Sequence, residues 1–296
     1  MIAVFLGAGF SAVGGVPLAA ELFDEVSAVD RVSRENLVSR VLSAWHDWRA
    51  TNHGQPEQYL AHLQTRGGRI WQEAQWYVGL VIALRMGRLQ LVGGRPTVTR
   101  HNINRASGIG IHEEFWTSIF SRTENVSVIT TNYDILAERG LRHTPRPGVP
   151  RPGFHYGRGA EELDGGGYPS FAHLRRIAID GNVPLLKLHG SVSWSYRENR
   201  LIRYYDCRPS LRGDPAIVAP VTAKTIPAYL KPVWALAEKT LIASDLWLIV
   251  GYSLPDYDQL VRELFRRAYH DHLQIHLFNP NESVGERFRG GKWGRI

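Results

Sequence analysis

The sequence predicts an α/β protein with a Rossmann-like, doubly wound, mostly parallel sheet and an inserted helical layer or subdomain. Apolar, β-branched runs recur with helical patterns between them, which favours parallel strands covered on both faces. The first of these runs, Ile2–Leu6, breaks directly into Gly7-Ala8-Gly9. The chain has 296 residues, of which 44% are hydrophobic and 21% charged, as is typical of a globular protein with a sizeable core. We expect residues 1–296 to form one domain.

The first predicted unit is a strand, a glycine turn and a helix. Pro17 suits the first turn of a helix, and apolar spacing predicts that this helix covers Leu18–Val29. Glycines in the turn would let a phosphate approach the backbone, and the helix dipole would attract its charge. The turn does not match the dinucleotide-binding fingerprint, because Phe10-Ser11-Ala12 replaces the third glycine.

A long helical block follows the first unit. Apolar residues keep helical spacing from Ser33 to Arg122, with a final amphipathic helix at His112–Ser121. The block is larger than an ordinary crossover between parallel strands. We therefore expect residues 30–122 to form an inserted helical layer or subdomain. The nine tryptophans lie mostly at helical spacing, which favours packing in the core over stacking on nucleic-acid bases.

Strand patterns return after this block. The predicted strands are Val126–Thr131, Pro184–Leu188, Ala216–Ala219, Leu246–Val250 and Gln274–Phe278, with helices at Tyr229–Ala243 and Asp256–Tyr269. Ligands of parallel α/β sheets bind beyond the carboxyl ends of the strands. The residues that we expect at this edge are Gly7, Asn132, His189, Gly251 and Asn279.

Composition narrows the class of protein further. Residues 139–183 are rich in proline, glycine and arginine, which predicts an irregular loop region. The formal charge of +7 is spread along the chain, so a solvated basic surface is favoured over direct nucleic-acid binding.

The single cysteine, Cys207, rules out a disulfide framework or a cysteine-based zinc site within the chain. With no signal-peptide pattern or membrane span, we expect a cytoplasmic protein.

Three motifs give the strand ends a more specific meaning. They are Gly7-Ala8-Gly9-Phe10-Ser11 with Gly15-Val16-Pro17, Thr130-Thr131-Asn132-Tyr133-Asp134, and Lys187-Leu188-His189-Gly190-Ser191. In this order they resemble the signatures of the sirtuin superfamily. More narrowly, they are similar to the prokaryotic sirtuin-like NADase family of antiphage defence systems. The later Val250–Asp258 and Phe278-Asn279-Pro280 match that family's ribose- and adenine-side segments.

The resemblance implies a substrate and roles for particular residues. It implies binding of NAD and cleavage of its nicotinamide–ribose bond, giving nicotinamide and ADP-ribose. Asn132 would fix a ribose hydroxyl or the attacking water, His189 would act as general base, and Asp134 would accept the nicotinamide amide N–H. The diphosphate would lie on the glycine turn, the adenosine ribose near Gly251 and the adenine near Asn279. The residues implied in NAD binding are Gly7, Ala8, Gly9, Ser11, Pro17, Thr131, Gly251, Ser253 and Asn279.

The same residues have structural alternatives. Asn132 could cap a helix that starts at Tyr133, Asp134 could lie at that helix N-terminus for the dipole alone, and His189 could be a satisfied core histidine. The chain also departs from sirtuin deacylases, because residues 195–214 are too short and too poor in cysteine for their zinc ribbon. A NAD-dependent protein deacylase and an inactive NAD- or ADP-ribose-binding scaffold are therefore the alternatives to a NAD glycohydrolase.

The resemblance also implies a cellular context. Such proteins act in antiphage defence by depleting NAD, so we expect a homo-oligomer or a partner such as a HerA-type ATPase or an Argonaute-like protein. We expect no metal cofactor, because no carboxylate pattern completes a set of ligands with His270, His272 and His276.

Overall fold

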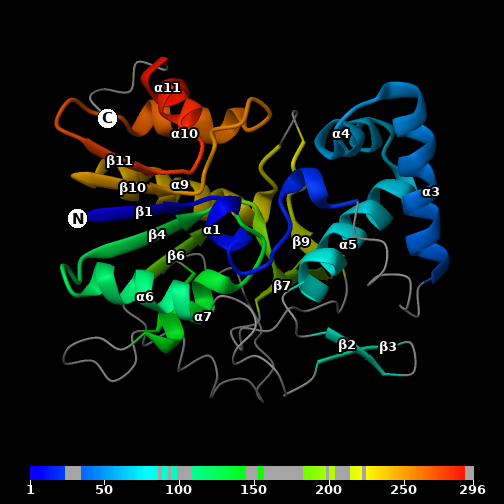
Figure 1. Ribbon diagram of the computed structural model, residues 1–296, viewed down its shortest axis with the longest axis horizontal. Helices are drawn as coiled ribbons and strands as arrows, with labels where there is room; N and C mark the ends of the chain where they lie inside the picture. Colours follow the sequence, from blue (N-terminus) through cyan, green and yellow to red (C-terminus); the bar gives the residue numbers. More distant parts are fainter. Residues whose placement is uncertain are drawn as a thin grey trace.

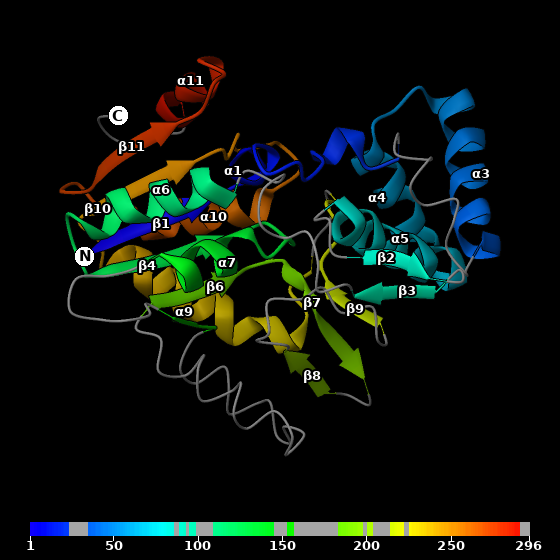
Figure 2. The same ribbon diagram turned by 60° about the horizontal axis from the view of Figure 1, so that its bottom comes forward.

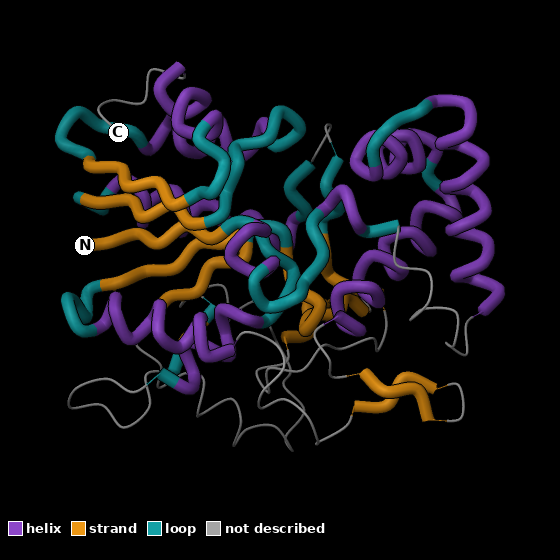
Figure 3. The backbone as a smooth tube through the Cα atoms, viewed as in Figure 1, coloured by secondary structure: helices purple, strands orange, loops and turns teal. Residues whose placement is uncertain are grey.

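The computed structural model of the protein describes residues 1–23, 35–85, 89–92, 95–98, 109–144, 153–156, 183–197, 200–203, 214–221 and 225–290. At its centre is a six-stranded parallel sheet in the order β11-β10-β1-β4-β6-β5 (Figures 1 and 3). The predicted α/β class is confirmed. The strands are β1 (Ile2–Leu6), β4 (Val126–Thr130), β5 (Phe154–His155), β6 (Val183–Lys187), β10 (Leu246–Val250) and β11 (Gln274–Phe278).

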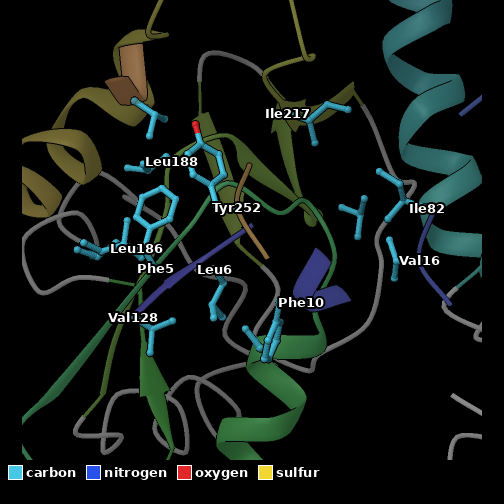
Figure 4. Close-up of a cluster of buried hydrophobic side chains, with 14 of the residues drawn as sticks. Phe5, Leu6, Phe10, Val16, Ile82, Val128, Leu186, Leu188, Ile217 and Tyr252 are labelled. Atoms are coloured by element: carbon cyan, nitrogen blue, oxygen red, sulfur yellow. The ribbon is translucent and has the colours of Figure 1, made fainter. Parts of the chain in front are cut away.

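Helices cover both faces of this sheet, as a doubly wound fold requires (Figure 2). On one face lie α6 (Ile109–Phe120) and α7 (Leu136–His143), and on the other α9 (Lys231–Ile242) and α10 (Gln259–Ala268). β1 has β10 and β4 as its neighbours in the sheet, and its residues from Ala3 to Leu6 are fully buried. Phe5 contacts Tyr252 and Phe265, with ring centroids 4.9 and 4.7 Å apart, and Figure 4 shows Phe5 beside Tyr252 in this core.

The first helix does not lie where the sequence predicts it. α1 (Ala8–Ala12) begins two residues after β1 and ends before the pair Gly14-Gly15. Glycines commonly end helices in this way. Pro17 lies in non-helical chain, and the next helical turn is the 3-10 helix η1 (Ala19–Glu21). Of the predicted helix Leu18–Val29, only residues 19–21 are helical, as this short 3-10 turn; residues 18, 22 and 23 are not helical, and residues 24–29 lie outside the described part of the chain.

A helical layer lies beyond the carboxyl ends of the parallel strands (Figure 1). Phe23 packs among Trp45, Tyr59 and Tyr77 of this layer, with ring centroids 5.0, 5.4 and 5.2 Å from its own. Trp45 is 2% exposed, in agreement with the predicted core role of the tryptophans. The layer consists of α3 (Glu35–Asn52), α4 (Pro56–Arg66) and α5 (Gly68–Arg85).

The chain between the first two parallel strands is not helical throughout. β2 (Leu89–Val92) and β3 (Arg95–Val98) form an antiparallel hairpin after α5. Gly93-Gly94 in the sequence is a known hairpin signal, and it outweighs the helical spacing around it. The predicted helical pattern is therefore wrong at residues 89–92 and 95–98, whereas α6 confirms the helix predicted at His112–Ser121. The division into one domain with an insertion at residues 30–122 stays a prediction.

A second, antiparallel sheet follows His189. β7 (Gly190–Arg197) pairs with β8 (Arg200–Arg203) on one side and with β9 (Asp214–Ile217) on the other. Of the strand predicted at residues 216–219, only residues 216–217 are in a strand, and they belong to this sheet and not to the parallel one. Gly190 has a φ of +78°, and a Cβ atom there would lie 1.9 Å from a backbone oxygen of β9. Only glycine allows the two strands to approach so closely.

The remaining predicted elements are largely confirmed. The helices expected at Tyr229–Ala243 and Asp256–Tyr269 correspond to α9, preceded by the 3-10 helix η3 (Ala228–Leu230), and to α10. The loop predicted over residues 139–183 is wrong at its start, where α7 continues to His143, and at β5; residues 145–152 and 157–182 lie outside the described residues. α11 (Ser283–Gly290) follows β11. None of the helices in the described ranges is long and apolar enough to cross a membrane.

Candidate functional site

A cavity of ≈ 280 Å³ opens at the carboxyl ends of β1, β4, β6, β10 and β11, where parallel α/β sheets bind their ligands. One side of the cavity is apolar and is formed by Val16, Leu22 and, from α5, Ile82. Figure 4 shows Val16 near Ile82, so the helical layer closes this side of the cavity. Most residues singled out in the sequence line this cavity: Ala8, Gly9, Ser11, Pro17, Thr131, Asn132, Asp134, His189, Gly251, Ser253 and Asn279.

The glycine turn packs against the turn that follows β10. Gly7 lies behind the cavity wall, and a Cβ atom there would lie 2.5 Å from the Cα atom of Tyr252. The N–H group of Gly9 donates to the carbonyl oxygen of Gly251 over 2.9 Å. A Cβ atom on Gly9 would lie 2.9 Å from the Cα atom of Gly251. The bare backbone of this turn is therefore needed first for contact between two protein segments, which the sequence interpretation in terms of a phosphate did not foresee.

Asn132 connects the end of β4 with the turn after β1. Its Nδ2 atom donates to the carbonyl oxygen of Gly7 (2.8 Å) and to Oγ of Ser11 (2.9 Å). The alternative in which Asn132 caps a helix starting at Tyr133 is wrong, because α7 begins only at Leu136. Since Nδ2 is engaged by protein groups, Oδ1 is the atom of this side chain left to accept a hydrogen bond from a ligand.

Asp134 lies two residues further along the same segment and is 3% exposed. Its Oδ1 atom accepts a hydrogen bond from the N–H of Leu136, the first residue of α7, over 2.9 Å. The carboxylate therefore does lie at a helix N-terminus, as the structural alternative held. Because Asp134 also lines the cavity, this position is compatible with contact to a ligand.

His189 follows β6 and faces Asp258, which directly precedes α10. The distance from Nε2 of His189 to Oδ1 of Asp258 is 3.6 Å, and both side chains are almost fully buried. The Tyr252 hydroxyl donates to the other carboxylate oxygen, Oδ2, over 2.9 Å. Burial, together with Asp258, raises the pKa of Tyr252, so its hydroxyl keeps its proton at neutral pH. The carboxylate is thus held by Tyr252 and directed at the imidazole, as in sites where an acid orients a base.

A model of the SIR2-like domain family matches residues 126–283, which is more than half of the 296-residue chain. The chain belongs to the SIR2-like domain family. The matched residues begin at β4 and include Asn132, Asp134, His189 and Asp258. β1 and the glycine turn lie before the matched residues.

Two solved structures illustrate the wider similarity of this SIR2-like chain. A Sir2 homologue in complex with NAD is 15% identical, with a TM-score of 0.43 and coverage of 98% of this chain and 89% of the other. A mutant of Sir2 homologues in complex with 2′-O-acetyl ADP-ribose is 16% identical, with a TM-score of 0.42 and coverage of 95% and 80%. No curated protein sequence matches the chain. The family assignment rests on the match over residues 126–283.

Sequence reasoning missed several polar groups at the site of this SIR2-like domain. Asp258 was placed with the ribose-side segment, and its contact with His189 depends on how the chain returns after β10. Burial raises the pKa of Tyr257, and the carboxylates of Glu57 and Asp258 raise it further. Glu57 belongs to the first turn of α4. The helical layer therefore contributes a carboxylate beside the cavity, and no motif in the sequence signals it.

The SIR2-like site has no metal-ligand pattern among the described residues, which contain no group of three His, Cys, Asp or Glu side chains arranged for an ion. His270, considered in the sequence, instead has Nε2 at 3.1 Å from the carbonyl oxygen of Ser244. Cys207 lies outside the described residues.

Proposed function

We propose that the protein is a NAD glycohydrolase, which cleaves the nicotinamide–ribose bond of NAD to give nicotinamide and ADP-ribose. The observation that carries this proposal is that Asn132, Asp134 and His189 line one cavity in a chain of the SIR2-like family. Each of these side chains alone has a structural explanation. Their position together at the ligand-binding edge of a parallel sheet favours a shared chemical role.

The proposed reaction uses water as the acceptor of ADP-ribose. The bond between C1′ of the ribose and the nicotinamide nitrogen breaks, and its electron pair goes to that nitrogen, which loses its positive charge. A water oxygen forms the new bond to C1′ and passes its proton to His189. Oδ1 of Asn132 accepts a hydrogen bond from this water or from a ribose hydroxyl, and Asp134 accepts one from the nicotinamide amide. A general base of this kind contributes ~10²- to 10⁴-fold in rate.

The rest of NAD would extend from this centre along the cavity. Ala8, Gly9 and Ser11 are proposed to contact the diphosphate, and the start of α1 favours a negative charge there. Gly7 would act indirectly, since its carbonyl oxygen holds the amide of Asn132. The other proposed contacts are Pro17 and Thr131 in the cavity wall, Gly251 and Ser253 at the adenosine ribose, and Asn279 at the adenine.

The chain after His189 supports hydrolysis over deacylation. β7 begins at Gly190, directly after His189, and forms an antiparallel sheet with β8 and β9. Sirtuin deacylases carry a four-cysteine zinc ribbon after this histidine, and the single Cys207 cannot build one. The acyl-peptide cleft that the ribbon helps to shape is therefore not expected here.

The function is tested by incubating the purified chain with NAD and measuring nicotinamide and ADP-ribose. We expect turnover without any acylated peptide, and a loss of at least about 100-fold in kcat for Asn132→Ala. Asn125→Ala is the matched control, because Asn125 is exposed and precedes β4 at the opposite end of the strand. Nicotinamide release that requires an acylated peptide would instead identify a deacylase. Binding of NAD in calorimetry without turnover would identify a scaffold.

We further propose that this activity serves antiphage defence by depleting NAD in the cytoplasm. The support is the motif resemblance, which also implies a homo-oligomer or a partner such as a HerA-type ATPase or an Argonaute-like protein. The same assay, repeated after addition of the product of a neighbouring gene, should then show a higher rate. An unchanged rate with every such product, in a chain that is active alone, would count against a required partner.

The contact between Asp258 and His189 predicts a loss of activity when the carboxylate is removed. A carboxylate that faces a histidine base orients the ring and stabilises the proton that the ring accepts. In Asp258→Asn we therefore expect kcat to fall by about tenfold or more, with a smaller change in KM for NAD. Asp256→Asn is the matched control, because Asp256 is 93% exposed and pairs with Arg262. Equal kcat values for Asp258→Asn and Asp256→Asn would show that Asp258 does not act on the base.

A further inference from the structure

A pair of opposite charges is buried behind the residues that line the cavity. Lys187 is the last residue of β6 and Glu138 lies in the first turn of α7, which covers this part of the sheet (Figure 2). Nζ of Lys187 lies 2.9 Å from Oε1 of Glu138, and the two side chains are 1% and 0% exposed. The hydroxyl of Tyr156 donates to the same carboxylate oxygen over 3.2 Å. Neither charged residue lines the cavity itself.

A contribution to the stability of the fold does not explain why this ion pair is buried. Burying two charges returns less than it costs unless all of their hydrogen-bonding groups are satisfied. Among the described residues, Oε2 of Glu138 has no hydrogen-bond partner. Burial raises the pKa of Glu138 even though Lys187 lowers it, so the surroundings on balance disfavour the ionised carboxylate. Replacing a buried ion pair by two apolar side chains of similar size is often neutral or stabilising, so the attraction between the two charges alone does not account for the pair.

The pair has a geometric consequence for the site. Nζ of Lys187 also donates to the backbone carbonyl oxygen of Asp134. Asp134 lies two residues after Asn132, and Lys187 lies two residues before His189. The neighbouring carbonyl oxygen, that of Tyr133, is held by a backbone N–H of β7 over 2.8 Å. The carbonyl of Asp134 depends instead on a side chain, which makes Lys187 a cross-link between the two segments.

We infer that Lys187 and Glu138 are positioning residues that hold the Asn132–Asp134 segment in register with His189 for the reaction. Glu138 directs the lysine head group, and the lysine fixes the carbonyl of Asp134. The inference rests on the proposed NAD glycohydrolase function. It assigns to the pair an effect on the geometry of the reacting groups. It assigns no effect on the binding of the diphosphate or the adenosine, whose proposed contacts lie in the segments that follow β1, β10 and β11.

The test is the double variant Lys187→Met/Glu138→Leu in the full chain. We expect it to fold with lower stability, because the carbonyl of Asp134 and the hydroxyl of Tyr156 lose their partners. We also expect it to lose at least about tenfold in kcat, with KM for NAD changed less than about threefold. Hydrogen exchange of residues 131–137 should become faster. The matched control is Arg267→Met/Glu238→Leu, which removes a half-exposed salt bridge of 2.8 Å on the surface. This control should leave kcat, KM and the hydrogen exchange of residues 131–137 unchanged.

The outcomes separate the inference from the function. A stable double variant with wild-type kcat and wild-type hydrogen exchange would overturn the positioning role. If the wild-type chain does not turn over NAD under any condition, the proposed function fails, and hydrogen exchange of residues 131–137 alone then decides the structural role of the pair. If the double variant does not fold, the single variant Lys187→Met carries the same test, since a buried Glu138 left without its partner can take up a proton.

Discussion

Replacing His189 by alanine is expected to lower kcat for NAD cleavage by ~10²- to 10⁴-fold, the usual contribution of a general base. The imidazole is 4% exposed, lines the cavity and lies 3.6 Å from the carboxylate of Asp258. Without it, the proton of the attacking water has no acceptor of suitable basicity at this position. The loss should appear in kcat, with a smaller effect on KM, because the proposed diphosphate and adenosine contacts follow other strands of the sheet. Steady-state nicotinamide release measures both.

His270→Ala is the matched control for this experiment. His270 is a partly buried histidine whose Nε2 atom lies 3.1 Å from the carbonyl oxygen of Ser244, but it lies before β11, at the edge of the sheet opposite the cavity. Its replacement should leave kcat within about twofold. If His189→Ala and His270→Ala retained similar turnover while both remained folded, His189 would have no role as a base.

Replacing Gly251 by alanine is expected to destabilise the fold by about 2–5 kcal/mol. Gly251 has a φ of +64°, which an L-residue adopts at a cost of ~1–2 kcal/mol. In addition, the new Cβ atom would lie 2.3 Å from the backbone nitrogen of Phe10. The turn after β10 and α1 would have to separate, which breaks the bond from Gly9 to Gly251. The free energy of unfolding, measured by urea titration, checks this prediction.

Gly15→Ala separates the two causes. Gly15 has a φ of +80°, but a Cβ atom there would meet nothing within 4 Å. It should therefore lose only the conformational part, ~1–2 kcal/mol. Equal losses for Gly251→Ala and Gly15→Ala would mean that the close approach between α1 and the β10 turn does not constrain the fold. NAD turnover should fall in Gly251→Ala alone, because Gly251 lines the cavity and Gly15 does not.

Strong periodicity made the parallel sheet predictable. β10 and β11 have the predicted bounds, and β4 and β6 differ from theirs by one residue at each changed end, because strands buried on both faces are continuous apolar runs. β7 was missed for a related reason. Ser191, Ser193 and Ser195 are all 1% exposed or less, so this strand is buried on both faces while its sequence alternates between polar and apolar residues. Hydroxyl groups that find partners inside the protein obscure the pattern.

The first helix shows the limit of local signals. Pro17 is compatible with a helix start, but α1 already begins at Ala8. Close packing of Gly7 and Gly9 against the turn after β10 places the chain there, and a contact between residues more than 240 positions apart leaves no trace in the local sequence. The antiparallel pair of β2 and β3 had its own signal in the sequence, Gly93-Gly94, but the prediction followed the helical spacing of the flanking residues.

The sequence by itself determined five of the six strands of the parallel sheet, β1, β4, β6, β10 and β11, and the polar residues that follow them, but it did not predict β5 or place residues 216–217 in the second sheet. Those features depend on local periodicity and on the rule that parallel strands present their carboxyl ends at one edge. Only the tertiary structure decided that Asp258 faces His189, that Glu57 of the helical layer lies beside the cavity, and that Lys187 holds the carbonyl of Asp134. These contacts join segments far apart in the chain, so their geometry depends on how the layers pack and not on any pattern within one segment.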